Sequence, residues 1–235
     1  MKVACHQPVY FARLHLAQRW LNVDRLVWLR NVQFARKSPD EFGVQRPTGQ
    51  QSTDIAELGK DRIRLTVPVS GSRQTLAQTA ISGSEWTGKH LATLRSNYAR
   101  MGWWDAYGES LTELLGRHHA SLSDLNIATF NWVCRAIGVD GPQQLVDDGM
   151  ICYGSDRIVK CCLLAEAKTY VAGKPSLTSY LDERQFADNG IVLEAQDWKV
   201  PEYSQPSAKF ERNLSVLDLI LSVGGDRARH LLMEV

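Results

Sequence analysis

Residues 2–34 read KVACHQPVYFARLHLAQRWLNVDRLVWLRNVQF, and this stretch decides the fold class. Its apolar pattern predicts a buried strand over 2–6, an amphipathic helix over about 12–21 and a second buried strand over 25–30. A strand–helix–strand unit of this size is right-handed in nearly all proteins, so the two strands are expected to be parallel neighbours. The stretch therefore predicts an open α/β sheet.

Regular patterns in the rest of the chain extend this sheet. Further strands are expected at about 62–69, 78–82, 144–146, 150–153, 170–172 and 191–195. Helices are expected at about 87–101, 103–117, 121–137, 156–168, 179–189, 214–223 and 226–233. We therefore predict an α/β fold in which residues 1–235 form a single Rossmann-like domain, with a mostly parallel sheet and a helical insertion over about 87–138.

Residues 35–60 interrupt the regular pattern. They are polar and contain five prolines and glycines, namely Pro39, Gly43, Pro47, Gly49 and Gly59, as is typical of a loop. Loops of this length inside a compact domain are usually functional or mobile. In the strand that follows, Pro68 favours an edge position, because proline cannot donate to a strand ladder.

The composition is that of an ordinary globular protein. The 235 residues are 44% hydrophobic and 23% charged, and 27 basic against 26 acidic residues leave a formal net charge of +1. This balance argues against a nucleic-acid binder. No apolar run reaches the roughly 18 residues that a membrane span needs, and no signal peptide is expected. The odd count of five cysteines fits a reducing compartment, so a cytoplasmic location is expected.

Candidate chemistry begins in the loop after the first strand. His6, Gln7 and Tyr10 surround Pro8 there, and open α/β sheets usually build ligand sites at the carboxyl ends of their strands. Cys5 and His6 with distant partners could instead hold a structural zinc ion, but no Cys-x-x-Cys pair supports this alternative. The binding site is therefore expected at this edge of the sheet.

The segment from Gly83 to His90 has the spacing of a phosphate-binding P-loop. In a P-loop the last position is Ser or Thr, which holds magnesium, but here it is His90. The bulky side chain of Trp86 also fits poorly in a phosphate-binding loop. The alternative is an ordinary helix start, with Ser84 or Thr87 near the N-cap. A histidine at a helix N-terminus tends to stay neutral, which would suit His90 as a general base.

Polar and charged residues within helices provide further candidates. Asp218 has apolar neighbours on all sides of a helix, so its carboxylate is expected to be buried. A buried carboxylate needs a partner, which could be an Arg, a His or a backbone N–H group. Asp218 then belongs either to the site or to a structural ion pair. Ser155 and Arg157 begin a helix, where they form either an anion clamp or an N-cap with a solvated arginine. Cys162 on the same helix has no visible base, which leaves a thiolate nucleophile with little support.

Taken together, these residues resemble the bacterial WbqC-like family. Residues 2–10 resemble its opening strand and His-Gln-Pro-Asn-Tyr loop, 32–34 the end of its Asp-Asp-Val-Gln-Phe stretch, and 65–69 its next strand. Further matches follow in the family's order: Trp86, His90-Leu91, Tyr98, Leu125-Asn126, Ser155, Arg157, Tyr170, Gly173, 180–182, Phe186, Gly190-Ile191, 201–205 and 214–224. Each motif is weak alone, but their order and spacing cover essentially the whole chain.

The resemblance implies a bacterial cytosolic enzyme of surface-polysaccharide (O-antigen) or secondary-metabolite biosynthesis, an aminoacyl or acyl transferase of the glycine type. On this interpretation the catalytic residues are His6, His90 and Asp218, with one of the histidines as general base. The substrate-binding residues are Gln7, Tyr10, Gln33, Lys37, Arg46, Ser155, Arg157, Tyr203 and Gln205. Arg30-Asn31 replace two acidic residues of the family pattern, and residues 38–46 replace an Asn/Arg-rich segment. These departures leave open a different substrate or a lost activity.

Two other function classes stay open. One is an ATP-dependent ligase or nucleotidyltransferase-like enzyme, although His6 and His15 lack the spacing of an ATP signature. The other is a non-catalytic partner in a biosynthetic assembly with an interface at Trp103-Trp104, residues that are rather expected to be core anchors. No cofactor is certain. The expected co-substrate is an acyl or aminoacyl thioester donor or ATP. The expected substrate is a small molecule or one bound to a carrier. A homodimer is one expected oligomeric state.

Overall fold

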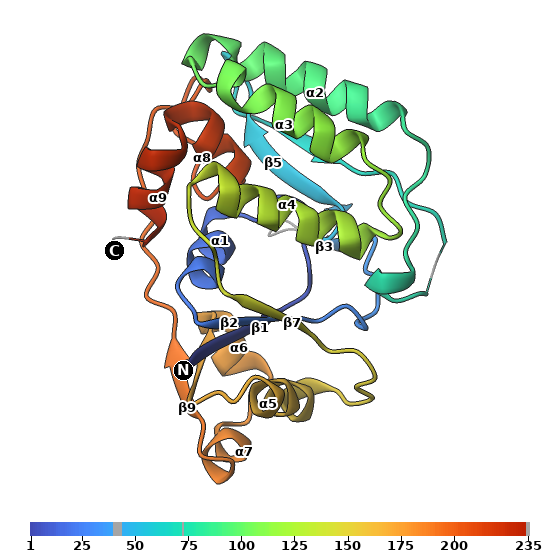
Figure 1. Ribbon diagram of the computed structural model, residues 1–235, viewed down its shortest axis with the longest axis vertical. Helices are drawn as coiled ribbons and strands as arrows, with labels where there is room; N and C mark the ends of the chain where they lie inside the picture. Colours follow the sequence, from blue (N-terminus) through green and yellow to red (C-terminus); the bar gives the residue numbers. More distant parts are fainter. Residues whose placement is uncertain (40–43, 72, 234–235) are drawn as a thin grey trace.

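The computed structural model describes residues 1–39, 44–71 and 73–233, and a five-stranded sheet lies at its centre (Figure 1). The strands are β1 (Lys2–His6), β2 (Arg25–Trp28), β7 (Gln143–Val146), β8 (Thr169–Ala172) and β9 (Val192–Ala195). They lie in the order β7-β2-β1-β8-β9, and every pairing in this sheet is parallel. The predicted Rossmann-like α/β fold is confirmed.

This strand order places a topological switch point beside β1. The sheet grows from β1 toward β7 on one side, and the chain then returns to add β8 and β9 on the other side. Such a reversal leaves a crevice at the carboxyl ends of the two strands that flank it. β1 pairs with β2 from Val3 to His6, but it pairs with β8 only at Lys2 and Val3. Strands β1 and β8 therefore separate toward their carboxyl ends.

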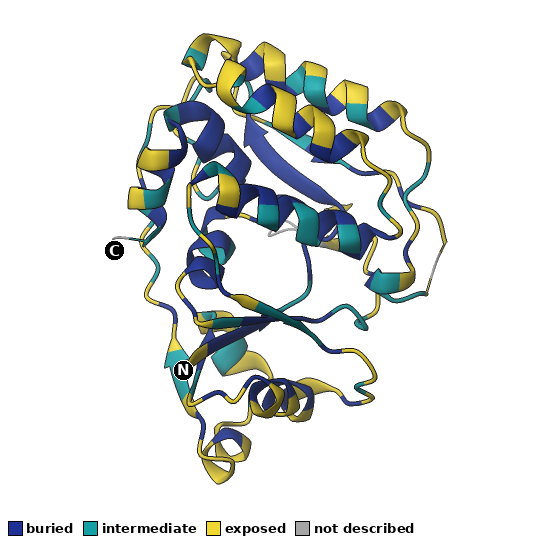
Figure 2. Cartoon of the chain, in the orientation of Figure 1, coloured by how far each residue is buried: buried dark blue, intermediate teal, exposed yellow. Residues whose placement is uncertain are grey.

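Helices cover both faces of the sheet. Alternate residues of a strand point to opposite faces, so Ala4 packs in the core beneath α1 (Leu14–Leu21), while Val3 and Cys5 pack in the core beneath α5 (Gly154–Leu164). The remaining helices around the sheet are α4 (Leu122–Ala136), α6 (Lys174–Ser179), α7 (Glu183–Asp188), α8 (Val216–Val223) and α9 (Gly225–Met233). Helices α4, α8 and α9 join the core of α1, and α7 joins that of α5. Figure 2 shows their buried residues turned inward.

The chain between β2 and β7 forms a second layer. In Figure 1, α4 is the part of this layer nearest the parallel sheet, and β5, α2 and α3 lie farther from the sheet. It contains β3 (Lys37–Pro39), β4 (Gln45–Pro47), β5 (Ser52–Ala56), β6 (Arg62–Thr66), the short 3-10 helices η1 (Leu76–Gln78) and η2 (Ala99–Met101), α2 (Glu85–Tyr98), α3 (Trp104–Gly116) and α4. The three helices expected between residues 87 and 138 are therefore present, but the insertion also carries two antiparallel strand pairs.

The prediction of an irregular loop over residues 35–60 is wrong. The segment holds β3, β4 and β5, and every residue of β5 is buried; residues 40–43, with Gly43, lie outside the described part. The polar side chains of β5 are satisfied internally. Ser52 Oγ donates to the Thr48 carbonyl over 2.9 Å, and Thr53 Oγ1 donates to the Phe11 carbonyl over 2.8 Å. A polar strand of this kind has the composition of a loop.

Three smaller expectations also need correction. Residues 150–153 form no strand, and Ile151 and Tyr153 are exposed. The expected strand at 78–82 is reduced to a single bridge between Val69 and Ile81. The helix expected over 179–189 is shortened to α7, because Asp182 caps the helix by accepting a hydrogen bond from the Arg184 N–H, and α6 before it was not predicted. In the described part of the chain no helix has the length and apolarity to cross a membrane.

Candidate functional site

The loop after β1 leads into a pocket of about 470 Å³, which we call the arginine pocket. Its walls come from this loop, the β3–β4 ribbon and the β5–β6 pair. Among its described lining residues are four arginines and a single acidic residue: Arg13, Arg46, Arg62, Arg64 and Asp54. This volume lies in the range of small-molecule sites, roughly 300–1,000 Å³. The pocket is therefore large enough for a substrate fragment and is built mainly from polar groups.

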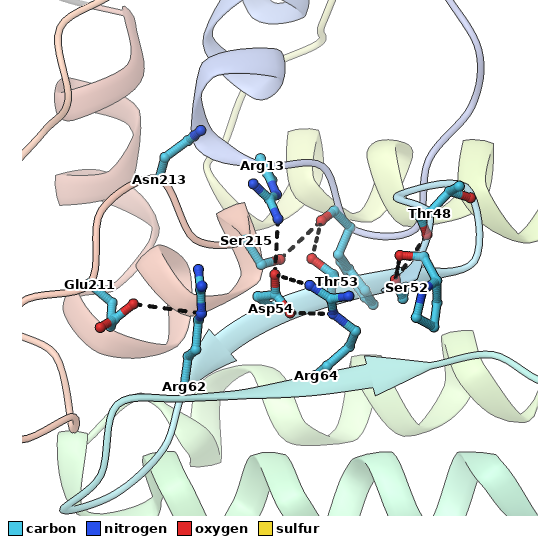
Figure 3. A network of polar contacts seen from close by, with 12 residues as sticks. Arg13, Thr48, Ser52, Thr53, Asp54, Arg62, Arg64, Glu211, Asn213 and Ser215 are labelled. Carbon is cyan, nitrogen blue, oxygen red and sulfur yellow. Dashed lines mark hydrogen bonds and ion pairs between the residues drawn. The ribbon is translucent and has the colours of Figure 1, made fainter. Parts of the chain in front are cut away.

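Asp54 orients two of the arginines (Figure 3). It lies directly opposite Arg64 in the antiparallel β5–β6 pair, so the two side chains share a face. Arg64 donates from Nε and Nη2 to the two carboxylate oxygens of Asp54 over 2.6 and 2.9 Å, and Arg13 Nη2 donates to Oδ2 over 2.9 Å. Arg62, two residues before Arg64, has its Nε 3.9 Å from Glu211 Oε2. Guanidinium groups from separate segments thus converge on one place.

The electrostatics of the pocket favour an anionic ligand. Burial alone would raise the pKa of Asp54, but the hydrogen bond and charge of Arg64, with the charges of Arg13 and Arg62, hold that pKa below its usual value. Asp54 is therefore ionised at neutral pH and balances one of these guanidinium charges, while the Glu211 carboxylate lies 3.9 Å from Arg62. Guanidinium groups present planar donors that match carboxylate and phosphate oxygens. The arrangement can bind such a group.

The loop that carries Arg13 is held in a strained conformation at Phe11. Phe11 has a φ of +38°, which is uncommon for a residue other than glycine. Its carbonyl oxygen accepts hydrogen bonds from Thr53 Oγ1 over 2.8 Å and Ser215 Oγ over 3.0 Å. The loop after β1, strand β5 and the start of α8 are thereby tied together. Strain that the surroundings hold in place tends to cluster at functional sites.

Tyr10 and His90, both predicted site residues, meet at the wall of the pocket. Tyr10 lines the arginine pocket, and its hydroxyl lies 3.0 Å from His90 Nδ1. Burial lowers the pKa of His90 to about 4, against an opposing hydrogen bond to the Thr66 backbone. His90 is therefore neutral at pH 7, as its sequence position suggested, but it is buried and does not line the pocket. Its role in this geometry is to position Tyr10.

His6 and Gln7 lie at the carboxyl end of β1, beside the switch point. The His6 ring packs on Trp20 at a centroid distance of 5.2 Å, and its Nδ1 lies 2.7 Å from the Gln7 carbonyl oxygen. Burial, aided by the charge of Arg19, lowers the pKa of His6 to about 3. The Gln7 side chain accepts a hydrogen bond from Gln50 over 2.8 Å. His6 is thus a neutral imidazole at the edge where the sequence predicted the site.

Asp218 is completely buried, as predicted, but its partners are tyrosines. It accepts hydrogen bonds from the Ala56 N–H over 2.8 Å, from the Tyr98 hydroxyl, and from the Tyr203 hydroxyl over 2.7 Å. Burial raises the pKa of Asp218, although these three hydrogen bonds partly oppose the rise. The expected backbone N–H partner is present, whereas the expected Arg or His is not. Asp218 and Tyr203 therefore belong to one buried network that joins α8 to β5 and α2.

Ser155 and Arg157 lie in the first turn of α5 with their polar groups already engaged. Arg157 donates from Nε and Nη2 to Oδ2 of the fully buried Asp147, over 3.1 and 2.5 Å. Ser155 Oγ donates to the Tyr180 carbonyl over 2.9 Å and accepts from the Asp182 N–H over 2.7 Å. The pair thus ties α5 to β7 and to the start of α7, which leaves neither side chain solvated.

The other predicted residues lie in separate surroundings. Gln33 and Lys37 are exposed, Lys37 in the β3–β4 ribbon opposite Pro47. Gln205 closes a loop by exchanging two hydrogen bonds with the backbone of Glu211, over 2.9 and 2.8 Å. Arg46 lines the arginine pocket. The structure therefore brings Tyr10 and Arg46 to one pocket, and it places the remaining predicted residues around it or elsewhere.

Two alternative chemistries receive no geometric support. The P-loop-like segment does not follow a strand of the parallel sheet; Ser84 precedes α2 at the N-cap position, and Lys89 is exposed. The five cysteines, Cys5 and Cys162 among them, are buried free thiols. Within the described residues, no three His, Cys, Asp or Glu side chains are grouped as a metal site. The ordinary helix start is the interpretation that the structure favours for residues 83–90.

The sequence interpretation missed Arg13, Asp54, Arg62 and Arg64. One signal was available, because Arg62 and Arg64 alternate with apolar residues in a predicted strand and must therefore share a face. The position of Asp54 opposite Arg64 had no such signal, since β5 itself was not predicted.

Comparisons with known proteins show the family to which the chain belongs. The family model of the WbqC-like protein family matches residues 7–230. The uncharacterized protein Rv1507c of Mycobacterium tuberculosis (strain ATCC 25618 / H37Rv) is 31% identical over 173 residues, which cover 71% of this chain and 74% of that protein. No solved structure matches. Because the family model spans nearly the whole chain, the protein belongs to the WbqC-like protein family.

Proposed function

We propose that this protein is an acyl or aminoacyl transferase whose arginine pocket binds the phosphate or carboxylate part of its substrate. The observation that carries the proposal is the convergence of Arg13, Arg62 and Arg64 on a pocket of about 470 Å³. Asp54, the one carboxylate among the described lining residues, holds two of them in place. Acyl and aminoacyl donors activated as thioesters of coenzyme A or of a carrier-bound phosphopantetheine bear phosphate groups. A cluster of guanidinium groups suits such a donor.

The loop after β1 would connect donor binding to proton transfer. Tyr10 lines the pocket and His6 lies four residues earlier, so the chain between them spans at most about 14 Å. A donor anchored by its phosphate could extend along this loop toward the neutral imidazole of His6. Burial lowers the pKa of His6 to about 3, so His6 is unprotonated at neutral pH and can accept a hydrogen bond from an amine or hydroxyl acceptor; to take that proton as a general base, its pKa would have to rise toward 7 when substrate binds. We assign the general base to His6 rather than to His90 because His6 lies at the carboxyl end of β1, whereas His90 is buried away from the pocket.

Arginine substitutions in the pocket test this proposal directly. In a titration with coenzyme A and an acyl-coenzyme A, Arg62→Gln should weaken binding by about tenfold, since a hydrogen bond to a charged group contributes roughly 1.5–3 kcal/mol. Arg227→Gln is the matched control, because Arg227 is exposed on α9 and lies outside the pocket. Equal affinities of the two variants for every phosphate-bearing donor would contradict the proposal. A His6→Gln variant that keeps full acyl-transfer activity would remove His6 from the mechanism.

The strand order favours one second candidate, an ATP-dependent enzyme. Nucleotides often bind at the switch point of a sheet such as β7-β2-β1-β8-β9. Thermal shifts with ATP and magnesium discriminate the two: a ligand at 100 times its Kd adds about 2.7 kcal/mol to the free energy of unfolding. A shift with ATP alone would favour this second function. A shift with thioester donors alone would favour the transferase.

A further inference from the structure

Arg19 is a buried charge without a partner among the described residues. It lies near the end of α1, and only 8% of its surface is exposed. Among the described residues none accepts a hydrogen bond from its guanidinium group, and its Nε is fully buried. Buried arginines are normally paired, because removing an unpaired charge from water is costly. Arg157, which is buried to the same degree, follows this rule through its ion pair with Asp147.

The guanidinium of Arg19 lies at the carboxyl end of β8. A Cβ atom added to Gly173 would lie 2.7 Å from Arg19 Nη1, so the guanidinium group packs against the bare Cα of Gly173 and would have to shift to admit a side chain there. The backbone of Gly173, with φ −69° and ψ 140°, would allow any residue. This is the place where β1 and β8 have separated after Val3 and Tyr170.

We propose that Arg19 forms an anion subsite beside the carboxyl end of β8, which takes the carboxylate or phosphate of a small ligand. The donors of a guanidinium group match the oxygens of either anion. This subsite is separate from the arginine pocket, whose lining does not include Arg19, and it does not depend on the transferase proposal.

The space beside Arg19 limits the size of the ligand. Arg19 lines a cavity of about 210 Å³ between α1 and strands β8 and β9. This is below the roughly 300 Å³ at which pockets for drug-sized ligands begin, so we expect a small anion in this cavity. Two acids line the same cavity: Glu194 is paired with Lys2 Nζ at 2.7 Å, and Asp197 is exposed. The ligand is therefore a small carboxylate or phosphate compound.

A site-resolved titration tests the subsite. The amide resonances of protein labelled with ¹⁵N-glycine are followed while inorganic phosphate or acetate is added at constant ionic strength. Gly173 reports on the switch point, and Gly49 reports on the arginine pocket. In the wild-type protein the Gly173 resonance should shift saturably with at least one anion, and the stronger of the two identifies phosphate or carboxylate as the preferred group. Arg19→Gln should weaken this response at least about tenfold, whereas the exposed-residue control Arg227→Gln should leave it unchanged.

Two outcomes would overturn the proposal. The first is a Gly173 resonance that responds to neither anion, or that responds equally in the wild-type protein and in Arg19→Gln. A response at Gly49 in the same experiment would still indicate anion binding in the arginine pocket. The second is a large drop in the melting temperature of Arg19→Gln without ligand, or its failure to fold, because the guanidinium would then be a structural element. An Arg19→Gln variant with an unchanged or higher melting temperature, a preserved Gly49 response and a lost Gly173 response supports the subsite.

Discussion

Asp218 allows the sharpest test of how the candidate residues divide between structure and chemistry. Its carboxylate is fully buried and accepts hydrogen bonds from the Ala56 N–H, the Tyr98 hydroxyl and the Tyr203 hydroxyl. Asp218→Ala would leave these three donors without an acceptor. A buried donor without a partner costs about 1–3 kcal/mol, and Ala56 and Tyr98 are fully buried while Tyr203 has some access to water. Because the substitution also removes a buried charge, we expect a net loss of about 2–4 kcal/mol.

The isosteric Asp218→Asn separates hydrogen bonding from charge. The asparagine oxygen can still accept from the Ala56 N–H and the Tyr98 hydroxyl, and its amide N–H can donate to the Tyr203 oxygen instead of accepting from it. We therefore expect a much smaller loss than for alanine. For a chain of this size each 1 kcal/mol moves the melting temperature by roughly 2–4 °C, so the two variants should differ clearly in thermal unfolding followed by circular dichroism.

The pH dependence of the same variants follows from the pKa of Asp218. Burial raises that pKa above its ordinary value of 3.8, so the folded protein holds the proton more tightly than the unfolded chain. The contribution of Asp218 to stability is fully present below pH 3.8 and is lost as the pH rises through the raised pKa. Asp218→Asn lacks this loss, so its stability relative to wild type should increase between pH 4 and pH 8. A difference that does not change with pH, or an asparagine variant as unstable as the alanine variant, would refute the reasoning.

Two further predictions concern the other buried charges. Arg157→Met should lower the free energy of unfolding measured in urea by about 3–5 kcal/mol, because it leaves the fully buried Asp147 without its counter-charge. The double variant that also carries Asp147→Asn should recover part of this loss. Full stability of Arg157→Met alone would contradict the buried ion pair. Asp54 has the opposite pH dependence to Asp218, since its pKa lies below the ordinary 3.8: its stabilising contribution is present above pH 3.8 and is lost as the pH falls through the lowered value. The pH at which acid unfolding begins should therefore differ between the wild-type protein and Asp54→Asn. Onset at the same pH in both proteins would show that the ion pair with Arg64 contributes nothing to stability.

The fold class could be predicted because its signals are local. Strands β1 and β2 and helix α1 appear in the structure within about two residues of their predicted positions, since apolar residues recur with the period of each element. Strand β5 carried no such signal. Its Ser52, Thr53 and Asp54 are buried only because Thr48, Phe11 and Arg64 supply their hydrogen-bond partners, and two of these contacts come from outside the strand's own hairpin. Burial that depends on tertiary hydrogen bonds cannot be inferred from apolar periodicity.

The site was less predictable for a related reason. The apolar neighbours of Asp218 showed that its carboxylate needs a partner, but the partners are Tyr98 and Tyr203, which lie 120 and 15 residues away in the sequence and join it only through the packing of α8 against β5 and α2. The rule that a buried charge requires a partner holds for Asp218, for Asp54 and for Arg157 with partners from the chain. Arg19 is buried by the same packing, yet no described residue pairs with it. The rule then requires a partner beyond the described residues, and a bound anion beside the carboxyl end of β8 is the partner that we propose.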